Sequence, residues 1–355
     1  MNVRFGKRVV GDGHPCFITF EAGPTHSGLE SAKALITEAA KAGADAVKFQ
    51  VINPDRLVAD RSQLFEYQVL VDRETGRTET VVEPLYDLLK RRALSDHEWR
   101  ELKRHADHHG IVFFATVGFP EEVELMRQLG CASIKIASGD VNHVPLLRQV
   151  AETGMCIQLD TGNATLGEIE AAVDIIRSCG NENIIIHHCP SGYPARLEGI
   201  NLNIIRTLKS MFPYPVAYSD HSPGWDMDVA AVALGANMVE KTITFDRMTR
   251  SVEHMFSLEP PDMTRFVETI RSLHTAFGAR RRILTPAELR KRQEIRRSVH
   301  VKHNLAAGHR LSLSDLDYRR PGHGIPPSEV DRLVGRRLLR DKSAGERLEW
   351  SDLEE

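Results

Sequence analysis

Eight short runs rich in β-branched and aromatic residues alternate with helical stretches over the first 245 residues of the chain. The predicted strands are CFITFE (16–21), AVKFQ (46–50), VFFAT (112–116), SIKIA (133–137), CIQLD (156–160), IIIHH (184–188), VAYS (216–219) and MVEKT (238–242). Strands that alternate with helices typically form parallel sheets, because the chain must cross back to the other end of the sheet, usually through a helix, before the next parallel strand begins. Eight such units, followed by a helical segment at 261–278, predict an α/β fold of the (β/α)₈ barrel type. The alternative is an open doubly wound sheet, although no G-x-G-x-x-G turn follows the first strand.

The helical stretches carry local start and stop signals. The segment 95–110 opens with Ser95 and Glu98 at the spacing of a capping box. The segments 30–43 and 166–180 end at Gly43 and Gly180, and glycine is the residue that most often terminates a helix. We therefore expect three well-defined helices at these positions.

The length of 355 residues and a change in composition after residue 280 predict a second, smaller domain. Residues 1–280 are assigned to the barrel. Residues 281–297 are strongly basic and poor in apolar residues, which indicates an exposed linker or a stretch that helps to hold an anionic ligand. Residues 298–355 contain short strands broken by Gly and Pro, which predicts a compact β-rich domain. The long segment 51–94 has few periodic features and is expected to line a site as a loop.

Composition excludes several classes of function. Lys and Arg number 46 and Asp and Glu 49, so no strong positive field attracts nucleic acid or an anionic membrane surface. The first fifteen residues lack the apolar core of a signal peptide, and no apolar stretch is long enough to span a bilayer. The five cysteines form no C-x-x-C pair. Reduced thiols and a cytoplasmic location are therefore expected.

Polar side chains stand at the carboxyl end of each predicted strand, where barrel enzymes place their active sites. They include Glu21, Lys48, Gln50, Thr116, Lys135, Ser138, Asp160, His187, His188, Ser219, His221, Glu240 and Thr242. Two lysines, several hydroxyls and a histidine at one barrel mouth indicate a cradle for a small phosphorylated carboxylate. Spacing alone leaves two chemistries open. Lys48 or Lys135 could form a Schiff base with a carbonyl substrate, or both could clamp phosphoenolpyruvate while it forms a carbon–carbon bond.

Seven motifs in order resemble those of the sialic acid synthase family, which includes N-acetylneuraminate, legionaminate and pseudaminate synthases and spore-coat polysaccharide enzymes. The motifs are FEAGPTHSG (20–28), GADAVKFQ (43–50), IKIASGD (134–140), HCPSGYP (188–194), YSDHSPG (218–224), FSLEP (256–260) and RRPGHG (319–324). The resemblance runs from about residue 12 to the C-terminus. It implies a (β/α)₈ barrel followed by an antifreeze-like (SAF) domain. It also implies a homodimer in which each small domain covers the barrel mouth of the partner.

The resemblance further implies that phosphoenolpyruvate condenses with an N-acetylated amino-sugar aldehyde to give a nonulosonic acid, with phosphate released by C–O cleavage. The expected catalytic residues are Glu21, Lys48, Asp140 and His221. The expected substrate-binding residues are Gln50, Thr116, Lys135, Ser138, Asp160, Ser191, Tyr193, Ser219, Glu253 and Arg320, of which Arg320 acts on the partner's site. A divalent ion, Mn²⁺ or Mg²⁺, is expected to polarise the aldehyde.

Three positions depart from the family pattern. Asp160 replaces a serine, Thr242 replaces the second metal-binding histidine, and Glu253 replaces an aspartate that meets the acceptor. Because a threonine hydroxyl is a weak ligand for manganese, we expect His221 and Asp160 to be the metal ligands, with Asp140 nearby. The departures keep two other functions open, a Schiff-base pyruvate aldolase and a catalytically altered sugar-binding relative.

Overall fold

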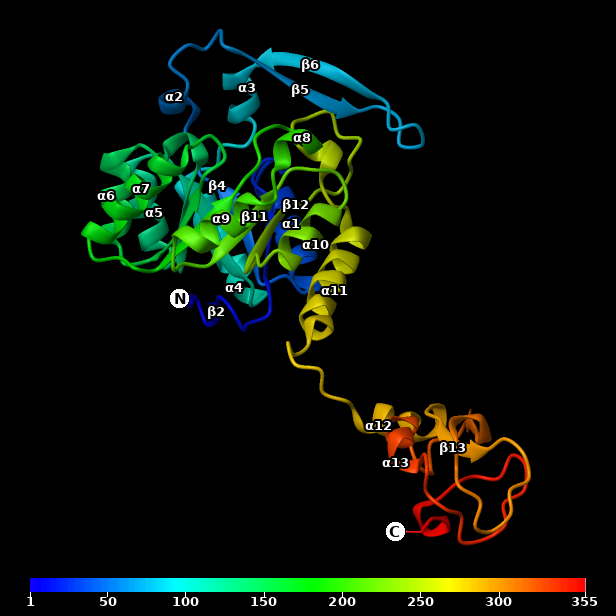
Figure 1. The fold of residues 1–355 in the computed structure, drawn as a ribbon. Coiled ribbons are helices and arrows are strands. Elements are labelled where there is room, and N and C mark those ends of the chain that lie inside the picture. The colour runs from blue at the N-terminus through cyan, green and yellow to red at the C-terminus, as the bar shows by residue number, and fades with distance from the viewer. Residues whose placement is uncertain (355) are drawn as a thin grey trace. The chain divides into compact units, whose positions relative to one another are not determined.

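Eight parallel strands close into a barrel in the computed structural model, which describes residues 1–354 (Figure 1). Around the barrel they are β3 (Phe17–Glu21), β4 (Ala46–Gln50), β7 (Val112–Val117), β8 (Ser133–Ile136), β9 (Cys156–Asp160), β10 (Ile184–His188), β11 (Val216–Asp220) and β12 (Met238–Thr242). The last strand, β12, pairs with β3 and completes the ring. The barrel prediction is confirmed, and ring closure excludes the open sheet.

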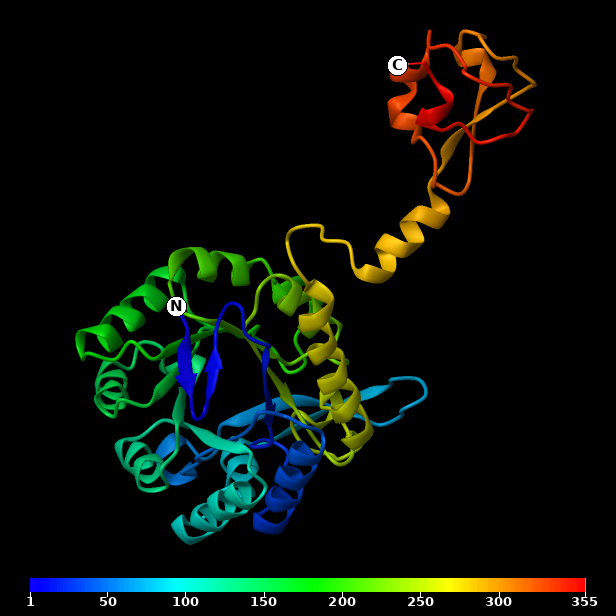
Figure 2. The same cartoon turned by 90° about the horizontal axis from the view of Figure 1, so that it is seen from below.

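Helices surround the barrel and bury their apolar faces against it (Figure 2). They include α1 (Leu29–Lys41), α4 (Asp96–His108), α5 (Pro120–Gln128), α6 (Val144–Glu152), α7 (Leu166–Ser178), α9 (Ile204–Met211), α10 (Asp226–Ala233) and α11 (Pro260–Phe277). The predicted capping box starts α4: the Ser95 amide donates to Glu98 Oε2 at 2.7 Å, and the Glu98 amide donates to Ser95 Oγ at 3.4 Å. These two bonds satisfy the backbone amides of Ser95 and Glu98, which have no partner within the helix.

An N-terminal hairpin closes the end of the barrel where the strands begin, an element that the sequence analysis did not predict. Its strands are β1 (Val3–Phe5) and β2 (Arg8–Val10). The Phe5 ring stacks on Phe17 with centroids 4.7 Å apart, and Val3, Phe5 and Val10 share an apolar cluster with the barrel. Figure 2 shows the hairpin across this end. The seal leaves the carboxyl ends of the strands as the open mouth.

The segment between β4 and β7 is more ordered than the predicted loop. It forms α2 (Pro54–Leu57), the antiparallel pair β5 (Leu64–Leu70) and β6 (Thr78–Pro84), and α3 (Leu85–Lys90). Tyr67 and Val69 on β5 pack with Leu88 and Val252 in a small separate core. The apolar alternation of β5 spans only seven residues and β6 is largely polar, so the hairpin does not stand out in the sequence. The hairpin and α3 lie at the mouth end of the barrel (Figure 1).

The chain divides into two compact units, with the boundary between Phe277 and Gly278. The second unit has a small core with Val299, Val301 and Leu348, and its strands β13 (Ser298–Val301) and β14 (Leu316–Arg319) are antiparallel. Short 3₁₀ turns, the helix α13 (Val330–Leu333) and isolated bridges supply the rest of its described structure.

Part of the basic segment before the second core forms a helix, α12 (Pro286–Ile295), which the sequence analysis did not predict. Thr285 and Glu288 form a capping box at its start, and α12 buries none of its residues. A good cap combined with strong helix formers explains a helix here despite the lack of an apolar face. Among residues 1–354, every helix is too short or too polar to cross a lipid bilayer.

Candidate active site

A cavity of about 260 Å³, here called the barrel cavity, opens at the carboxyl ends of the barrel strands. Most of the predicted site residues line it: Glu21, Lys48, Gln50, Thr116, Ser138, Asp140, Asp160, Tyr193, Ser219, His221 and Glu253. The segment after β4 also contributes, through Asn53 and Leu57, as expected of a site-lining segment. The barrel therefore gathers side chains from strands far apart in the sequence around one small volume.

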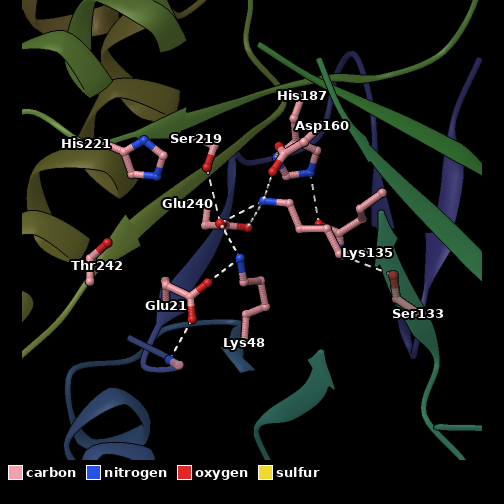
Figure 3. Close-up of polar contacts among 12 residues, drawn as sticks. Glu21, Lys48, Ser133, Lys135, Asp160, His187, Ser219, His221, Glu240 and Thr242 are labelled. Atoms are coloured by element: carbon pink, nitrogen blue, oxygen red, sulfur yellow. Dashed lines mark hydrogen bonds and ion pairs between the residues drawn. The ribbon is translucent and has the colours of Figure 1, made fainter. Parts of the chain in front are cut away.

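Glu240 on β12 joins the two predicted lysines (Figure 3). Lys48 Nζ lies 2.9 Å from Glu240 Oε1, and Lys135 Nζ lies 2.7 Å and 2.8 Å from its two oxygens. Ser219 Oγ donates to the same carboxylate at 3.1 Å. The amines of Lys48 and Lys135 thus converge on one carboxylate in the barrel interior.

Two further carboxylates complete this cluster. Lys48 is also paired with Glu21, and Lys135 Nζ lies 3.0 Å from Asp160 Oδ2. Strand register explains the first contact, because Glu21 and Lys48 are directly opposite partners on β3 and β4. Since all five side chains are buried, each charge depends on the others for compensation.

The pKa values of the cluster show which carboxylates hold a charge. Burial would raise the pKa of Glu240, but Lys135 and Lys48 outweigh this and hold it well below its usual value. Burial raises the pKa of Glu21 and of Asp160, and the lysines only partly oppose this. Glu240 is therefore the permanent counter-ion, whereas Glu21 and Asp160 accept protons more readily than ordinary carboxyls. An anionic ligand beside them would favour their protonated forms.

Lys48 remains an ammonium. Burial would lower its pKa, but Glu21 and Glu240 raise it well above the usual value. A Schiff base requires a neutral amine as nucleophile. The environment of Lys48 therefore favours a fixed cation over a covalent catalyst.

Glu253 is a buried residue that lines the same cavity and has an unusual backbone conformation. Its φ of +70° lies in the left-handed region, which is uncommon for a residue other than glycine and recurs at functional sites. Thr242 Oγ1 donates to Glu253 Oε2 at 3.2 Å. Burial, with Glu21 adding to it, raises the pKa of Glu253 to about 7. The barrel cavity therefore contains a carboxyl group that exchanges its proton near neutral pH.

The pKa of Glu253 predicts a pH-dependent stability. Because the folded carboxyl holds its proton up to about pH 7 whereas the unfolded one releases it near pH 4.5, the free energy of unfolding falls as the pH rises through this window. The contribution is at most about 3 kcal/mol. We expect Glu253→Gln to remove this contribution. The free energy of unfolding of the variant should therefore rise relative to that of the wild type as the pH increases from 4.5 to 7. Urea denaturation at several pH values measures the difference. A constant difference across the window would contradict the assignment.

Three predicted site residues, Lys135, Ser191 and Arg320, do not line the barrel cavity. Lys135 is buried and contacts Glu240. Thr242, which replaces the second histidine of the family pattern, also lies outside the lining and contacts Glu253. Ser191 is exposed and donates to Gly162 O at 3.0 Å, away from the cluster. Arg320 is an exposed residue of the second unit.

The predicted metal ligands are engaged elsewhere. Asp160 pairs with Lys135, while His221 Nδ1 lies 3.4 Å from Pro190 O and its ring centroid is 4.6 Å from that of Tyr193. Across residues 1–354, no three His, Cys, Asp or Glu side chains are grouped so as to hold a metal ion. The two expected ligands, His221 and Asp160, are therefore not part of a three-donor group among the described residues, and no step below depends on a metal.

Several lining residues had no role assigned from the sequence. Glu240 was visible at a strand end, but nothing in the sequence indicates that both lysines bind it. Cys189 and Glu122 also line the barrel cavity. Glu122 accepts from the Gly118 amide at 2.7 Å, so it shapes the loop after β7.

A closed (β/α)₈ barrel with a small, charged cavity at its strand ends is the architecture of a barrel enzyme that acts on a small polar substrate. Comparison with protein families specifies it further. The NeuB family model matches residues 35–282, and the SAF domain model matches residues 296–354. The chain belongs to the NeuB family, the sialic acid synthases, which are enzymes.

Named relatives are similar along nearly the whole chain. An N,N'-diacetyllegionaminic acid synthase from Legionella pneumophila is 36% identical over 350 residues, 97% of this chain and 96% of the relative. The N-acetylneuraminate-9-phosphate synthase of Homo sapiens is 32% identical over 337 residues, 94% and 91% of the two chains. The crystal structure of an N-acetylneuraminic acid synthetase from Leptospira borgpetersenii matches with a TM-score of 0.71 and 30% identity, covering 82% of this chain and 95% of that one.

Proposed function

We propose that the protein is a transferase that condenses phosphoenolpyruvate with an N-acetylated amino-sugar aldehyde to form a nonulosonic acid. The methylene carbon of phosphoenolpyruvate forms the new bond to the aldehyde carbon. Water then adds to the resulting oxocarbenium ion, and phosphate leaves by C–O cleavage. The convergence of Lys48 and Lys135 on Glu240 at the cavity floor is the observation that supports this proposal most strongly.

The cluster has groups that could stabilise the anionic donor as well as the positive charge that develops on it during the reaction. Lys48 attracts the anionic donor, and the hydroxyls of Thr116 and Ser138 line the same cavity as hydrogen-bond donors, while Ser219 donates to Glu240. Glu21 and Asp160 can take up protons as the donor binds, which reduces charge repulsion. When positive charge develops on the donor, Glu240 is a fixed negative group close to the lysines. Such preorganised charges stabilise a transition state without reorganisation.

The proposed reaction is tested by phosphate release from phosphoenolpyruvate when N-acetylmannosamine or a related acetamido sugar is added. Mass spectrometry of the product identifies the acceptor that condenses. Release that depends on the acceptor supports the synthase. Acceptor binding without phosphate release would instead support the catalytically altered sugar-binding relative.

A Schiff-base pyruvate aldolase is the competing enzyme. The charged state of Lys48 gives it less support. Borohydride reduction in the presence of pyruvate would trap a covalent adduct on such an enzyme. We expect no mass increase on the protein, and an adduct on Lys48 or Lys135 would overturn the proposal.

We also propose that the protein is a homodimer in which Arg320 of one subunit completes the site of the other. The exposure of Arg320 and its absence from the lining of the barrel cavity are compatible with this. Mixing inactive Arg320→Ala and Lys48→Ala subunits is expected to restore about a quarter of the wild-type activity, because half of the dimers are mixed and each has one complete site. Light scattering checks the dimer. A mixture that stays inactive although mixed dimers form would place Arg320 in its own subunit's site.

The requirement for Mn²⁺ or Mg²⁺ stays a prediction. Metal analysis of the purified wild type and of Asp160→Ala measures it. Because Asp160 is paired with Lys135, we expect any metal content to be the same in both proteins. The cytoplasmic location likewise stays a prediction.

A further inference from the structure

A second cavity of about 410 Å³, here called the arginine cavity, lies close to the barrel cavity. Two consecutive residues link them, because Glu253 lines the barrel cavity and His254 lines the arginine cavity. Three arginines line it: Arg91, which pairs with Glu83, Arg250, which pairs with Glu79, and Arg92. Serine and threonine hydroxyls provide most of the remaining lining, and none of its lining residues is acidic. A concave surface with this composition is complementary to an anion.

Arg92 is the central observation, because it is a buried cation that forms no ion pair among the described residues. Its relative exposure is 5%, and its Nε and Nη1 donate to backbone carbonyls, those of Leu88 at 3.3 Å and Pro24 at 3.0 Å. None of the ion pairs within residues 1–354 includes it. Burial lowers the pKa of Arg92, yet a guanidinium stays charged in proteins. The charge of Glu253 partly opposes this fall in pKa, but a buried cation without an ion-pair partner is costly and would be stabilised by a bound anion.

His26 supplies a second unpartnered donor. The Gly28 amide donates to His26 Nδ1 at 3.3 Å, so the neutral ring carries its proton on Nε2. This Nε2 is buried and has no hydrogen-bond partner, and the residue is only 3% exposed. Since His26 lines the arginine cavity, an acceptor atom there would satisfy its proton.

The start of α1 adds backbone donors to the same place. This helix has thirteen residues, and its N-cap Gly28 provides no side chain to bond the first amides. Ser27 and Ser31, which flank the helix start, line the arginine cavity. Helix N-termini bind phosphate groups through free amides and the positive end of the helix dipole.

We propose that the arginine cavity is a phosphate subsite that holds a phosphate group at the far end of the acceptor, so that the acceptor is a phosphorylated amino sugar. This inference rests on the proposed function. With the aldehyde carbon at the barrel cavity near Glu253, the distal phosphate enters the neighbouring space between Arg92, His26 and the start of α1. A phosphate offers enough oxygens for the guanidinium, the imidazole and the amides together.

Binding measurements with an acceptor that cannot react test this directly. The C1-reduced alditol of an N-acetylhexosamine 6-phosphate and its unphosphorylated counterpart are titrated into the full-length protein by calorimetry, with the donor site saturated by phosphoenolpyruvate. We expect the phosphorylated alditol to bind at least about tenfold more tightly. His26→Phe keeps the ring beside Phe49, and Arg250→Gln changes an exposed side chain, so both variants should fold. Each is expected to reduce the preference to about twofold or less.

Arg127→Gln is the matched control, because it removes an exposed arginine paired with Glu124 on α5, far from the lining residues in sequence. The Arg127→Gln variant should bind the phosphorylated alditol more tightly than the unphosphorylated one by the same factor as the wild type. Equal binding of the two alditols, or a preference that survives in both cavity variants, would overturn the proposal. Inorganic phosphate is titrated as a separate arm. If it binds in a His26-dependent manner while the two alditols bind equally, the ligand is free phosphate and the acceptor assignment is wrong. Phosphoenolpyruvate is titrated first and alone, so a failure of donor binding is recognised independently.

Discussion

Replacing Lys48 with methionine is expected to lower kcat/KM for phosphoenolpyruvate by about 10³-fold. The amine of Lys48 lines the barrel cavity and lies 2.9 Å from Glu240, so it is the fixed cation that an anionic donor meets. Methionine preserves much of the apolar stem but removes the charge and leaves Glu21 and Glu240 with one cation fewer. Phosphate-release kinetics measure the loss, and circular dichroism confirms that the variant is folded.

Lys33→Met is the matched control for this experiment. Lys33 on α1 also has two carboxylate partners, Glu30 at 3.0 Å and Glu101 at 2.7 Å, but it lies outside the barrel cavity. Its loss should leave kcat/KM within about twofold of the wild type, since surface ion pairs contribute little. A loss of less than tenfold in Lys48→Met would show that the cluster does not bind the donor.

Glu240→Gln is expected to lower the free energy of unfolding by about 3–5 kcal/mol. The substitution preserves shape but removes the one carboxylate that contacts both Lys48 and Lys135. Two buried ammonium groups then depend on Glu21 and Asp160 alone. Because the pKa values of these two carboxyls are raised, they compensate better at higher pH, and the destabilisation is expected to be largest in acid. Chemical denaturation followed by circular dichroism measures it.

The comparison variant for Glu240 is Glu101→Gln, which breaks a partly exposed pair with Lys33. A change of at most about 1 kcal/mol is expected there. If Glu240→Gln were equally mild, Glu240 would not be the counter-ion that holds the lysines together.

The barrel and the outline of its site could be predicted from the sequence because both follow from strand periodicity. Strand ends meet at one mouth in any (β/α)₈ barrel, so Lys48 and Lys135 could be placed near each other without coordinates. The bridging role of Glu240 could not, since it depends on side-chain reach across the barrel. The left-handed conformation of Glu253 and the unpaired state of Arg92 likewise arise from tertiary packing and have no local signal.

Two other elements, the N-terminal hairpin and the helix α12 that follows the predicted barrel domain, could not be predicted from hydrophobic periodicity. The N-terminal hairpin has three-residue strands, which are shorter than any period can reveal. The helix α12 has no apolar face, and the signal that does predict it is the capping box of Thr285 and Glu288. The metal requirement stays a prediction. Strand periodicity could place His221 and Asp160 at strand ends, but it could not reveal the ion pair between Asp160 and Lys135.

The N-terminal hairpin that seals the barrel base has a kinetic consequence. With Phe5 packed among the first residues of the strands, substrates and products share one entrance. The lysine cluster lies deep, whereas Tyr193 at the rim is 44% exposed. A molecule held at the rim would block the route to the lysines. Turnover should therefore follow a compulsory sequence, with the three-carbon donor entering before the sugar and the nine-carbon product departing before the next donor arrives.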